Sequence, residues 1–299
     1  MNRQLRSRVS TSLPVGIFAL PICANRQCLR PPTVWQRWWA RNEGIRFESE
    51  WFCSVDCFAA GLLPRLTTLS AEERLHRPTA NRLPLGLILL SRGSITSEQL
   101  RQALKLQREA AAGRIGEWLV RTGAATSRDV VNALAEQQGC PVFAPAGAQR
   151  FPEHFTLPLP LIRHYGGVPV FFSSAANSAY LGFAGRLSHS LLRAAEHVTG
   201  CRVKPCIISD AKYRTMVERW SGSISAQTVA VEQGLSPLEI GRSVASYAQQ
   251  TAAETCALSR CEQHVWVRLA SRTALIDLLF RVTAKSSEED ITSAHSWLD

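Results

Sequence analysis

Two close pairs of cysteines near the start of the chain have the residue type and spacing of a metal site. Cys23 and Cys28 lie in the stretch CANRQC, and Cys53 and Cys57 lie in FCSVDC. Four thiolates delivered by two tight turns suit tetrahedral zinc in a closed structural site. Such a site stabilises a segment that is too small to build its own core. We therefore predict a zinc module over residues 1–65; the alternative is a set of ordinary buried cysteines.

The stretch FCS-x-x-C resembles one type of small treble-clef zinc finger. The other cysteines do not repeat this paired pattern, and we interpret them as small buried residues. These are Cys140, Cys201, Cys206, Cys256 and Cys261.

Two stretches of 24 residues share one sequence pattern, the first over residues 84–107 and the second over residues 114–137. Each copy begins with a short apolar turn and then has a glycine, which is typical of a helix C-terminus. A capping-box signal follows, TSEQ in the first copy and TSRD in the second. Apolar residues then recur at helical spacing. Each copy therefore predicts a helix–turn–helix hairpin, and the two hairpins are expected to share one core.

Two features of the repeat allow either a structural or a ligand-binding interpretation. Gly86 and Gly116 each fall inside the short first helix predicted for their own copy, where glycine costs about 1 kcal/mol of helix stability relative to alanine. They could permit tight packing in a four-helix bundle, or close approach of a ligand to the backbone. Gln107 and Gln137 continue an otherwise apolar stripe, so their amides need hydrogen-bond partners.

The pattern R-[LI]-G-x-x-L-x-x-x-G-x-x-x-x-x-x-[LV]-x-x-x-L-x-x-Q resembles the tandem motif of the MshEN domain. This domain is the N-terminal part of type II secretion and type IV pilus assembly ATPases. The resemblance implies binding of cyclic di-GMP, with one motif for each half of the ligand. It implies a ligand-binding set of Leu85, Gly86, Gly93, Gln107, Arg114, Ile115, Gly116, Gly123 and Gln137. In the first motif, however, Pro84 stands where the arginine belongs, and proline offers neither a guanidinium group nor a backbone donor.

Residues 150–220 predict an α-β-β-α-β-α layer, with helices over a three-stranded sheet. The stretch TGCRVKP within it resembles the second half of the same secretion-ATPase domain. A linker is expected over residues 221–237, and a helix plus a strand pair over 236–284. The polar tail over 285–299 is expected to be a frayed end. The predicted class is therefore α+β, built from a zinc module, a tandem helical-hairpin repeat, this layer and a C-terminal segment.

Composition limits the classes of function. The chain has 299 residues, 45% of them hydrophobic, and a net charge of +10, which favours anionic partners. No apolar run approaches the length of a membrane span, and no signal peptide is recognised. A cytoplasmic, reducing location is therefore expected, with the cysteines as thiols or metal ligands. The chain has no G-x-x-x-x-G-K-[ST] phosphate-binding loop, so we do not expect it to be a motor ATPase or another enzyme.

Three functions remain open from the sequence. The first is a bacterial regulator or adaptor that carries structural zinc and binds cyclic di-GMP through the repeat. The second is a scaffold that binds a secretion or pilus assembly protein and no nucleotide, which Pro84 favours. The third is nucleic-acid binding, suggested by the zinc module and the basic charge. The long helices of the repeat have few basic residues, which argues against the third.

Overall fold

The computed structural model describes residues 22–28, 44–71, 82–143, 150–223 and 227–282. Over these residues the chain is an α+β protein with two β-sheets, as the sequence predicted. Residues 1–21 and 29–43 of the predicted zinc module lie outside the described residues, and so does the predicted polar tail over 285–299. No helix in the described part of the chain has the length and apolar character needed to cross a membrane.

The tandem repeat forms four helices that alternate in length, namely α3 (Leu85–Ser91), α4 (Ser97–Ala110), α5 (Ile115–Arg121) and α6 (Ser127–Gln138). Thr96 and Thr126 cap the two long helices, each in the predicted capping box. Gly93 and Gly123 follow the short helices with φ angles of 67° and 69°. Glycine adopts this left-handed conformation without strain, so the predicted role of these glycines as helix terminators is confirmed.

The two copies of the repeat are interlaced. α3 packs mainly against α6, and α4 packs mainly against α5, so each short helix is held chiefly by a long helix of the other copy. Leu89 and Leu119 occupy matching positions, and both are fully buried in the common core. A helix of seven residues depends on tertiary packing for its stability, which explains why neither hairpin stands alone. The prediction of one shared core is confirmed, and the structure adds that the two hairpins exchange their short helices within it.

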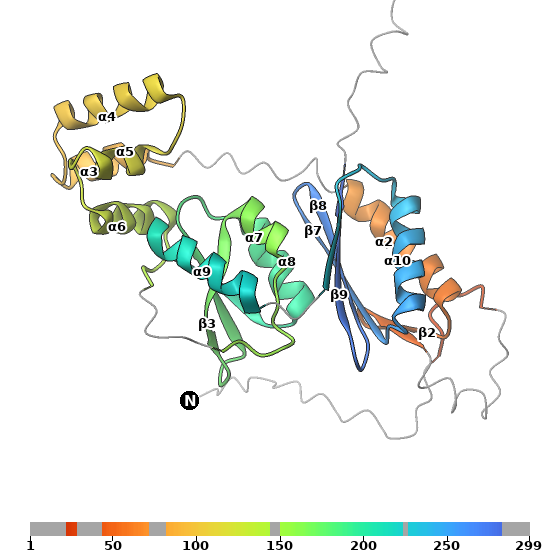
Figure 1. Cartoon of the computed structure of the whole chain (residues 1–299). Coiled ribbons are helices and arrows are strands. Elements are labelled where there is room, and N and C mark those ends of the chain that lie inside the picture. Colours follow the sequence, from red (N-terminus) through yellow and green to blue (C-terminus); the bar gives the residue numbers. More distant parts are fainter. Residues whose placement is uncertain (1–21, 29–43, 72–81, 144–149, 224–226, 283–299) are drawn as a thin grey trace, which may run out of the picture.

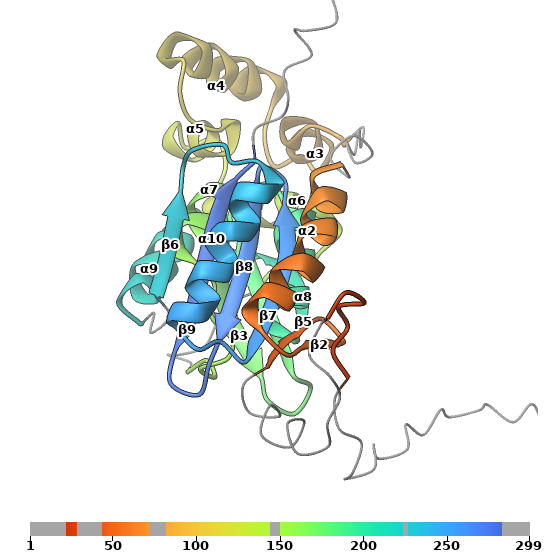
Figure 2. The same ribbon diagram turned by 90° about the vertical axis from the view of Figure 1, so that its right-hand side faces the viewer.

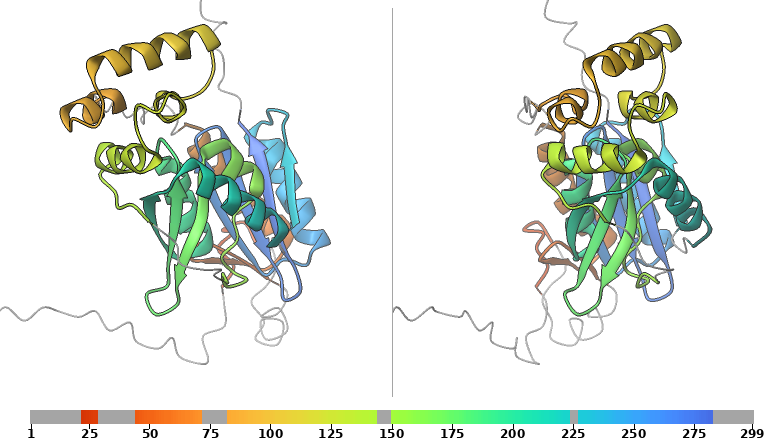
Figure 3. Two further views of the ribbon diagram at one scale, coloured as in Figure 1. Left: turned by 60° about the vertical axis from the view of Figure 1, so that its left-hand side comes forward. Right: turned by 90° about the vertical axis from the view of Figure 1, so that its left-hand side faces the viewer.

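The α+β layer has the predicted order of elements. It contains α7 (Leu159–Tyr165), β3 (Gly167–Ser173), β4 (Ser178–Phe183), α8 (His189–Thr199), β5 (Arg202–Ile207) and α9 (Asp210–Ser223). β3 and β4 are antiparallel, and β5 pairs in parallel with β4. The helices of the repeat lie at one end of the molecule, with α6 closest to the three-stranded sheet (Figures 1 and 3). Val142, just beyond α6, forms a parallel bridge with Ile207 of β5.

The second sheet has six strands in the order β2-β1-β7-β8-β9-β6. Its strands are β1 (Ile45–Phe47), β2 (Glu50–Phe52), β6 (Gln227–Val231), β7 (Thr255–Cys261), β8 (His264–Ala270) and β9 (Leu275–Arg281). Two C-terminal predictions need correction, because the supposed linker contains β6 and the supposed strand pair is a meander of three strands. The predicted C-terminal helix is α10 (Pro237–Gln250), and Ala252 has a φ of 47° in the turn before β7.

The zinc module does not form a separate unit in the structure. Its strand β1 pairs in parallel with β7, so it extends the C-terminal sheet. Its helix α2 (Val55–Ala71) lies beside α10 on one face of that sheet (Figure 2). The side chains between them form a common core with residues such as Phe58 and Val244. The boundary predicted at residue 65 therefore does not mark a fold boundary. Pairing between segments so far apart along the chain leaves no local signal in the sequence.

The arginine of a buried ion pair within the six-stranded sheet also connects this sheet to the segment that leads into α7 of the α+β layer. Arg268 of β8 donates to both carboxylate oxygens of Asp277 of β9, at 2.8 and 2.9 Å. The same guanidinium group donates to the backbone oxygen and the hydroxyl of Thr156, and Trp266 donates to Asp277 at 2.8 Å. Helix α8 packs on β7 from the layer side. The six-stranded sheet is therefore covered on both faces, by α2 and α10 on one and by the layer on the other.

Candidate functional site

A cavity of about 360 Å³ lies where the tandem repeat meets the α+β layer. Its walls come from both copies of the repeat, from the loop after β4 and from the start of α9. Six of the nine residues implied by the family resemblance line it, namely Leu85, Gln107, Arg114, Ile115, Gly116 and Gln137. The structure therefore brings most of the predicted ligand-binding set to one recess.

Gly86, Gly93 and Gly123 are not among the lining residues. Gly93 and Gly123 end the short helices, as described above. A Cβ atom at Gly86 would lie 2.7 Å from Cδ1 of Leu100, so glycine is needed there for close packing of α3 on α4. A Cβ atom at the matching Gly116 would lie 2.9 Å from Cγ1 of Val130. Tight packing thus accounts for both in-helix glycines, although Gly116 also contributes to the cavity wall.

The two glutamines that close the motifs make equivalent hydrogen bonds. Nε2 of Gln107 donates to the carbonyl oxygen of Gly113 at 2.9 Å. Nε2 of Gln137 donates to the carbonyl oxygen of Leu83 at 2.7 Å. Gly113 and Leu83 each precede the first position of a motif, so each glutamine ties the end of one motif to the start of the other. This satisfies the partner requirement noted in the sequence and gives the repeat an approximate twofold symmetry.

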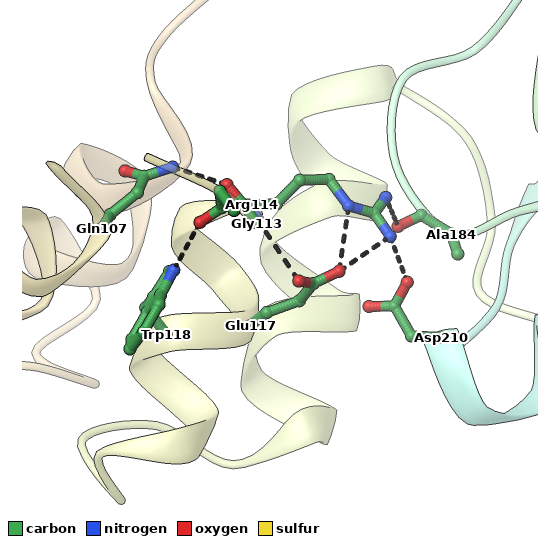
Figure 4. Close-up of polar contacts among 8 residues, drawn as sticks. Gln107, Gly113, Arg114, Glu117, Trp118, Ala184 and Asp210 are labelled. Atoms are coloured by element: carbon green, nitrogen blue, oxygen red, sulfur yellow. Dashed lines mark hydrogen bonds and ion pairs between the residues drawn. The ribbon is translucent and has the colours of Figure 1, made fainter. Parts of the chain in front are cut away.

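Arg114 is the main polar group of the cavity (Figure 4). Its Nη1 donates to the carbonyl oxygen of Ala184 at 2.7 Å. Its guanidinium group also forms ion pairs with Glu117, one turn further along α5, and with Asp210 at the start of α9. The side chain is nevertheless 54% exposed. Arg114 therefore links the repeat to the layer and still presents its guanidinium group to the cavity.

Sequence reasoning missed the lining residues that come from the layer. Gly185 and Arg186 follow β4, and a Cβ atom at Gly185 would lie only 2.4 Å from Nη1 of Arg114. Arg186 makes no ion pair with any described residue, so the cavity contains one arginine paired with carboxylates and one without such a partner. The only sequence signal was a Gly-Arg pair after a predicted strand, and such pairs are common in loops.

A second, more open depression of about 640 Å³ lies beside α6. It contains none of the predicted ligand-binding residues. Arg92 and Glu136 line it and form an ion pair with each other. Arg92 is therefore a useful comparison for Arg114, because it is an arginine of the same repeat outside the first cavity.

The four cysteines of the predicted zinc site come together. The sulfur atoms of Cys23, Cys28, Cys53 and Cys57 all lie within 4.8 Å of one another. The Cys28–Cys53 and Cys53–Cys57 sulfur separations are 3.5 and 3.8 Å. A tetrahedron with zinc–sulfur bonds of about 2.3 Å has edges of about 3.8 Å. The two sulfur separations are therefore close to those of a tetrahedral zinc site, and the donor set fits a structural zinc ion.

The surroundings of the cluster perturb the pKa values of its thiols in opposite directions. Burial raises the pKa of Cys53 to about 12, and hydrogen bonds from Cys28 and Cys23 act in the same direction. Burial also acts to raise the pKa of Cys57, but hydrogen bonds from Ser54 and Asn25 outweigh it and lower the value to about 7. A lower thiol pKa favours the thiolate, which is the form of cysteine that binds metal. Of the other five cysteines four are buried as expected, whereas Cys140 is only half-buried.

Comparison with known proteins gives matches among solved structures alone. No protein-family model matches the chain, and no curated protein matches it. One match is a structure of MshE with cdg, which is 20% identical in sequence to this chain and has a TM-score of 0.35. The matched region covers 46% of this chain and 99% of the MshE chain. The N-terminal domain of XpsE is 20% identical over 48% of this chain and 97% of its own, with a TM-score of 0.33. A second crystal form of that domain is 23% identical, covers 44% and 90%, and has a TM-score of 0.27.

Proposed function

We propose that this chain is a non-enzymatic bacterial regulator or adaptor that binds cyclic di-GMP in the cavity at Arg114. The observation that carries the proposal is the convergence of six predicted ligand-binding residues on one recess. The volume of the recess lies within the range of about 300–1,000 Å³ that is typical of small-molecule sites. The chain has no phosphate-binding loop of the motor type, so its proposed task is to sense or to dock.

The polar groups of the cavity suit a guanine nucleotide. Arg114 can contact a phosphate with its planar fork or stack on a purine. Arg186 provides a second positive charge without a carboxylate partner among the described residues. Gln107 and Gln137 already donate to backbone carbonyl oxygens, so in this proposal they fix the cavity walls. Their role in this proposal is to position the groups that contact the ligand.

Binding of an anionic ligand would change how the repeat is attached to the layer. Arg114 joins the two parts through Ala184 and Asp210. Its ion pairs are partly exposed, and pairs of this kind contribute only about 0–1 kcal/mol each. A phosphate could therefore compete with Asp210 and Glu117 for the guanidinium group. Such an exchange would let ligand occupancy alter the position of the repeat, which is what a regulator requires.

The proposed partner is a secretion or pilus assembly protein in the cytoplasm. A second candidate function, a docking scaffold without nucleotide, is favoured by the apolar residues at the start of α3. Leu83 and Leu87 are 67% and 48% exposed, with Pro84 between them. Co-purification with secretion or pilus platform proteins, with and without cyclic di-GMP, distinguishes the two. A nucleotide-independent complex would favour the scaffold.

We also propose a structural zinc ion at the four clustered cysteines. When bound, zinc would supply the cross-link between the turn at Cys23 and Cys28 and the start of α2, without a catalytic step. This part of the proposal rests on the arrangement of the four sulfur atoms. It places the metal at the edge of the six-stranded sheet, next to β2.

Calorimetric titration of the purified chain with cyclic di-GMP tests the main proposal. We expect saturable heat, and Arg114→Ala should weaken binding by about 1.5–3 kcal/mol, the range for a hydrogen bond to a charged group. Arg92→Ala should leave the affinity unchanged, because Arg92 lies in the other depression. The absence of heat with up to about 100 μM ligand would rule out tight binding and reject the nucleotide proposal.

A further inference from the structure

Within the repeat, the charged side chains that line the cavity, Arg114 and Glu117, come only from the second copy. All five residues of the second-motif start, residues 113–117, line it, whereas only Leu85 of the matching first-motif start, residues 83–87, does so. The backbone of the repeat is close to symmetric, since the two closing glutamines make equivalent bonds. The asymmetry therefore lies in the side chains and in what the layer contributes next to α5.

Matching positions of the two starts have opposite chemical character. Arg114 corresponds to Pro84, and Glu117 corresponds to Leu87, in each case 30 residues apart. The first turn of α5 thus has a guanidinium group and a carboxylate, whereas the first turn of α3 has no acidic residue. Leu87 is 48% exposed and apolar, whereas Glu117 at the matching position forms an ion pair with Arg114. The first-motif start therefore has no charged side chain that could pair with a phosphate.

The nearest arginine does not replace the missing one. Arg82 lies two residues before Pro84, and its Nη1 donates to the side-chain oxygen of Gln138. Its Nη2 lies 3.4 Å from Nε2 of His189. Arg82 is not among the residues that line the cavity. Its guanidinium group is directed to the junction of α6 and α8, so the first half of the repeat contributes no cation to the site.

We infer, on the basis of the proposed function, that the site recognises a single guanylate unit. Cyclic di-GMP has two identical guanylate halves, and the repeat offers charged groups to one of them. The half at α5 would meet Arg114 and Arg186, whereas the half at α3 would meet Pro84 and Leu87 and remain largely solvated. A cavity of about 360 Å³ is also near the lower end of the range of about 300–1,000 Å³ for ligand sites. The ligand class is therefore any compound with one accessible guanosine phosphate.

Titration of the wild-type chain with three ligands tests this inference. The ligands are guanosine monophosphate, the linear dinucleotide pGpG and cyclic di-GMP. We expect dissociation constants that agree within about fivefold, a difference of about 1 kcal/mol, because one half supplies the binding free energy in each case. A preference of wild type for cyclic di-GMP over the mononucleotide of about 100-fold or more would overturn the inference and leave the proposed function intact. Failure of all three ligands to bind would instead reject the proposed function together with the inference.

Restoring the missing charges provides the second arm of the experiment. Pro84 has a φ of −56° and a ψ of 140°, and Arg114 has −96° and 149°, so arginine can adopt the backbone conformation at residue 84. Pro84→Arg combined with Leu87→Glu should strengthen cyclic di-GMP binding by about tenfold or more and leave mononucleotide binding unchanged. Leu87→Glu alone, at an exposed position, is the control for folding and should have little effect on either ligand. An equal gain in affinity for cyclic di-GMP and for guanosine monophosphate would show that the double variant has not created a second guanylate-binding half at α3.

Discussion

The side-chain amide of Gln137 donates a 2.7 Å hydrogen bond to the carbonyl oxygen of Leu83, at the start of the other copy of the repeat. Gln107 makes the equivalent bond to Gly113. Because these bonds hold the starts of the short helices, they also hold two walls of the cavity. The packing of α3 on α6 and of α4 on α5 also holds the short helices in place, through their buried side chains.

Replacement of Gln137 should therefore weaken the whole repeat. We expect Gln137→Met to lower the free energy of unfolding by about 1 kcal/mol, the usual net value of a hydrogen bond. Urea denaturation followed by circular dichroism measures it. Gln102→Met is the matched control, because Gln102 is exposed on α4 and should change stability by less than about 0.5 kcal/mol. Equal effects of the two substitutions would show that the bond to Leu83 does not stabilise the fold.

Gly185 should be required for the position of Arg114. A Cβ atom at residue 185 would lie 2.4 Å from Nη1 of Arg114, so Gly185→Ala must displace the guanidinium group. We expect about a tenfold loss of cyclic di-GMP affinity in calorimetric titration, with normal folding. Gly222→Ala serves as the control, since a Cβ atom at that residue meets nothing within 4 Å. Unchanged affinity in Gly185→Ala would mean that Arg114 does not contact the ligand.

Metal removal should destabilise the six-stranded sheet. We expect one zinc ion per chain by atomic absorption, and Cys53→Ser should abolish binding because structural zinc needs all four ligands. Chelation should lower the melting temperature by about 5 °C or more, since loss of the ion removes folding free energy. Cys140→Ser should retain the metal, because Cys140 lies outside the cluster. A chain that melts identically with and without chelator has no structural zinc.

Stability should decrease in mild acid because of His264. Burial lowers the pKa of His264 below its ordinary value of 6.5, and the nearby His164 acts in the same direction. A histidine with a lower pKa in the folded state takes up a proton on unfolding. The neutral histidine therefore contributes to the free energy of unfolding above the pKa that it has in the unfolded chain. This contribution is lost as the pH falls through the lower pKa of the folded protein.

Denaturation measured between about pH 7.5 and pH 5 should therefore show a falling free energy of unfolding. His264→Asn should reduce the slope, whereas His197→Asn, at an exposed position of α8, should leave it as in wild type. His264 also contacts the hydroxyl of Tyr165 at 2.8 Å, so the variant has a lower stability at every pH. Only the slope, and not the absolute value, tests the titration of His264.

Local signals in the sequence predicted the repeat and the cysteine cluster well. Thr96 and Thr126 with their capping partners fixed the helix starts, because a capping box needs only four consecutive residues. The pairs at Cys23 and Cys53 suggested one site because thiolate pairs rarely fall so close together by chance. These features depend on neighbours along the chain, which the sequence displays directly.

Contacts between distant segments could not be predicted in the same way. Asp210 and Ala184 reach Arg114 from the layer, and neither carries a pattern that points to it. The pairing of Arg46 with Thr255 joins two strands that look unremarkable in isolation. The strand β7 contains alanine and leucine among small polar residues, a composition that fits a helix equally well, so the sequence predicted only two of the three strands of the meander.

The parallel pairing of β1 with β7 has a consequence for synthesis of the protein. Strand β1 emerges from the ribosome more than 200 residues before the strand that it joins. During that interval the interlaced helices of the repeat and the pairing of β3, β4 and β5 can form, because these contacts lie within residues 82–207. Strands β1 and β2 can pair with each other at once, but the other edge of β1 has no partner until β7 is made, and contacts of such long sequence separation are slow to form. Until then β1 presents an exposed sheet edge, and such edges are the sites at which chains pair wrongly with one another.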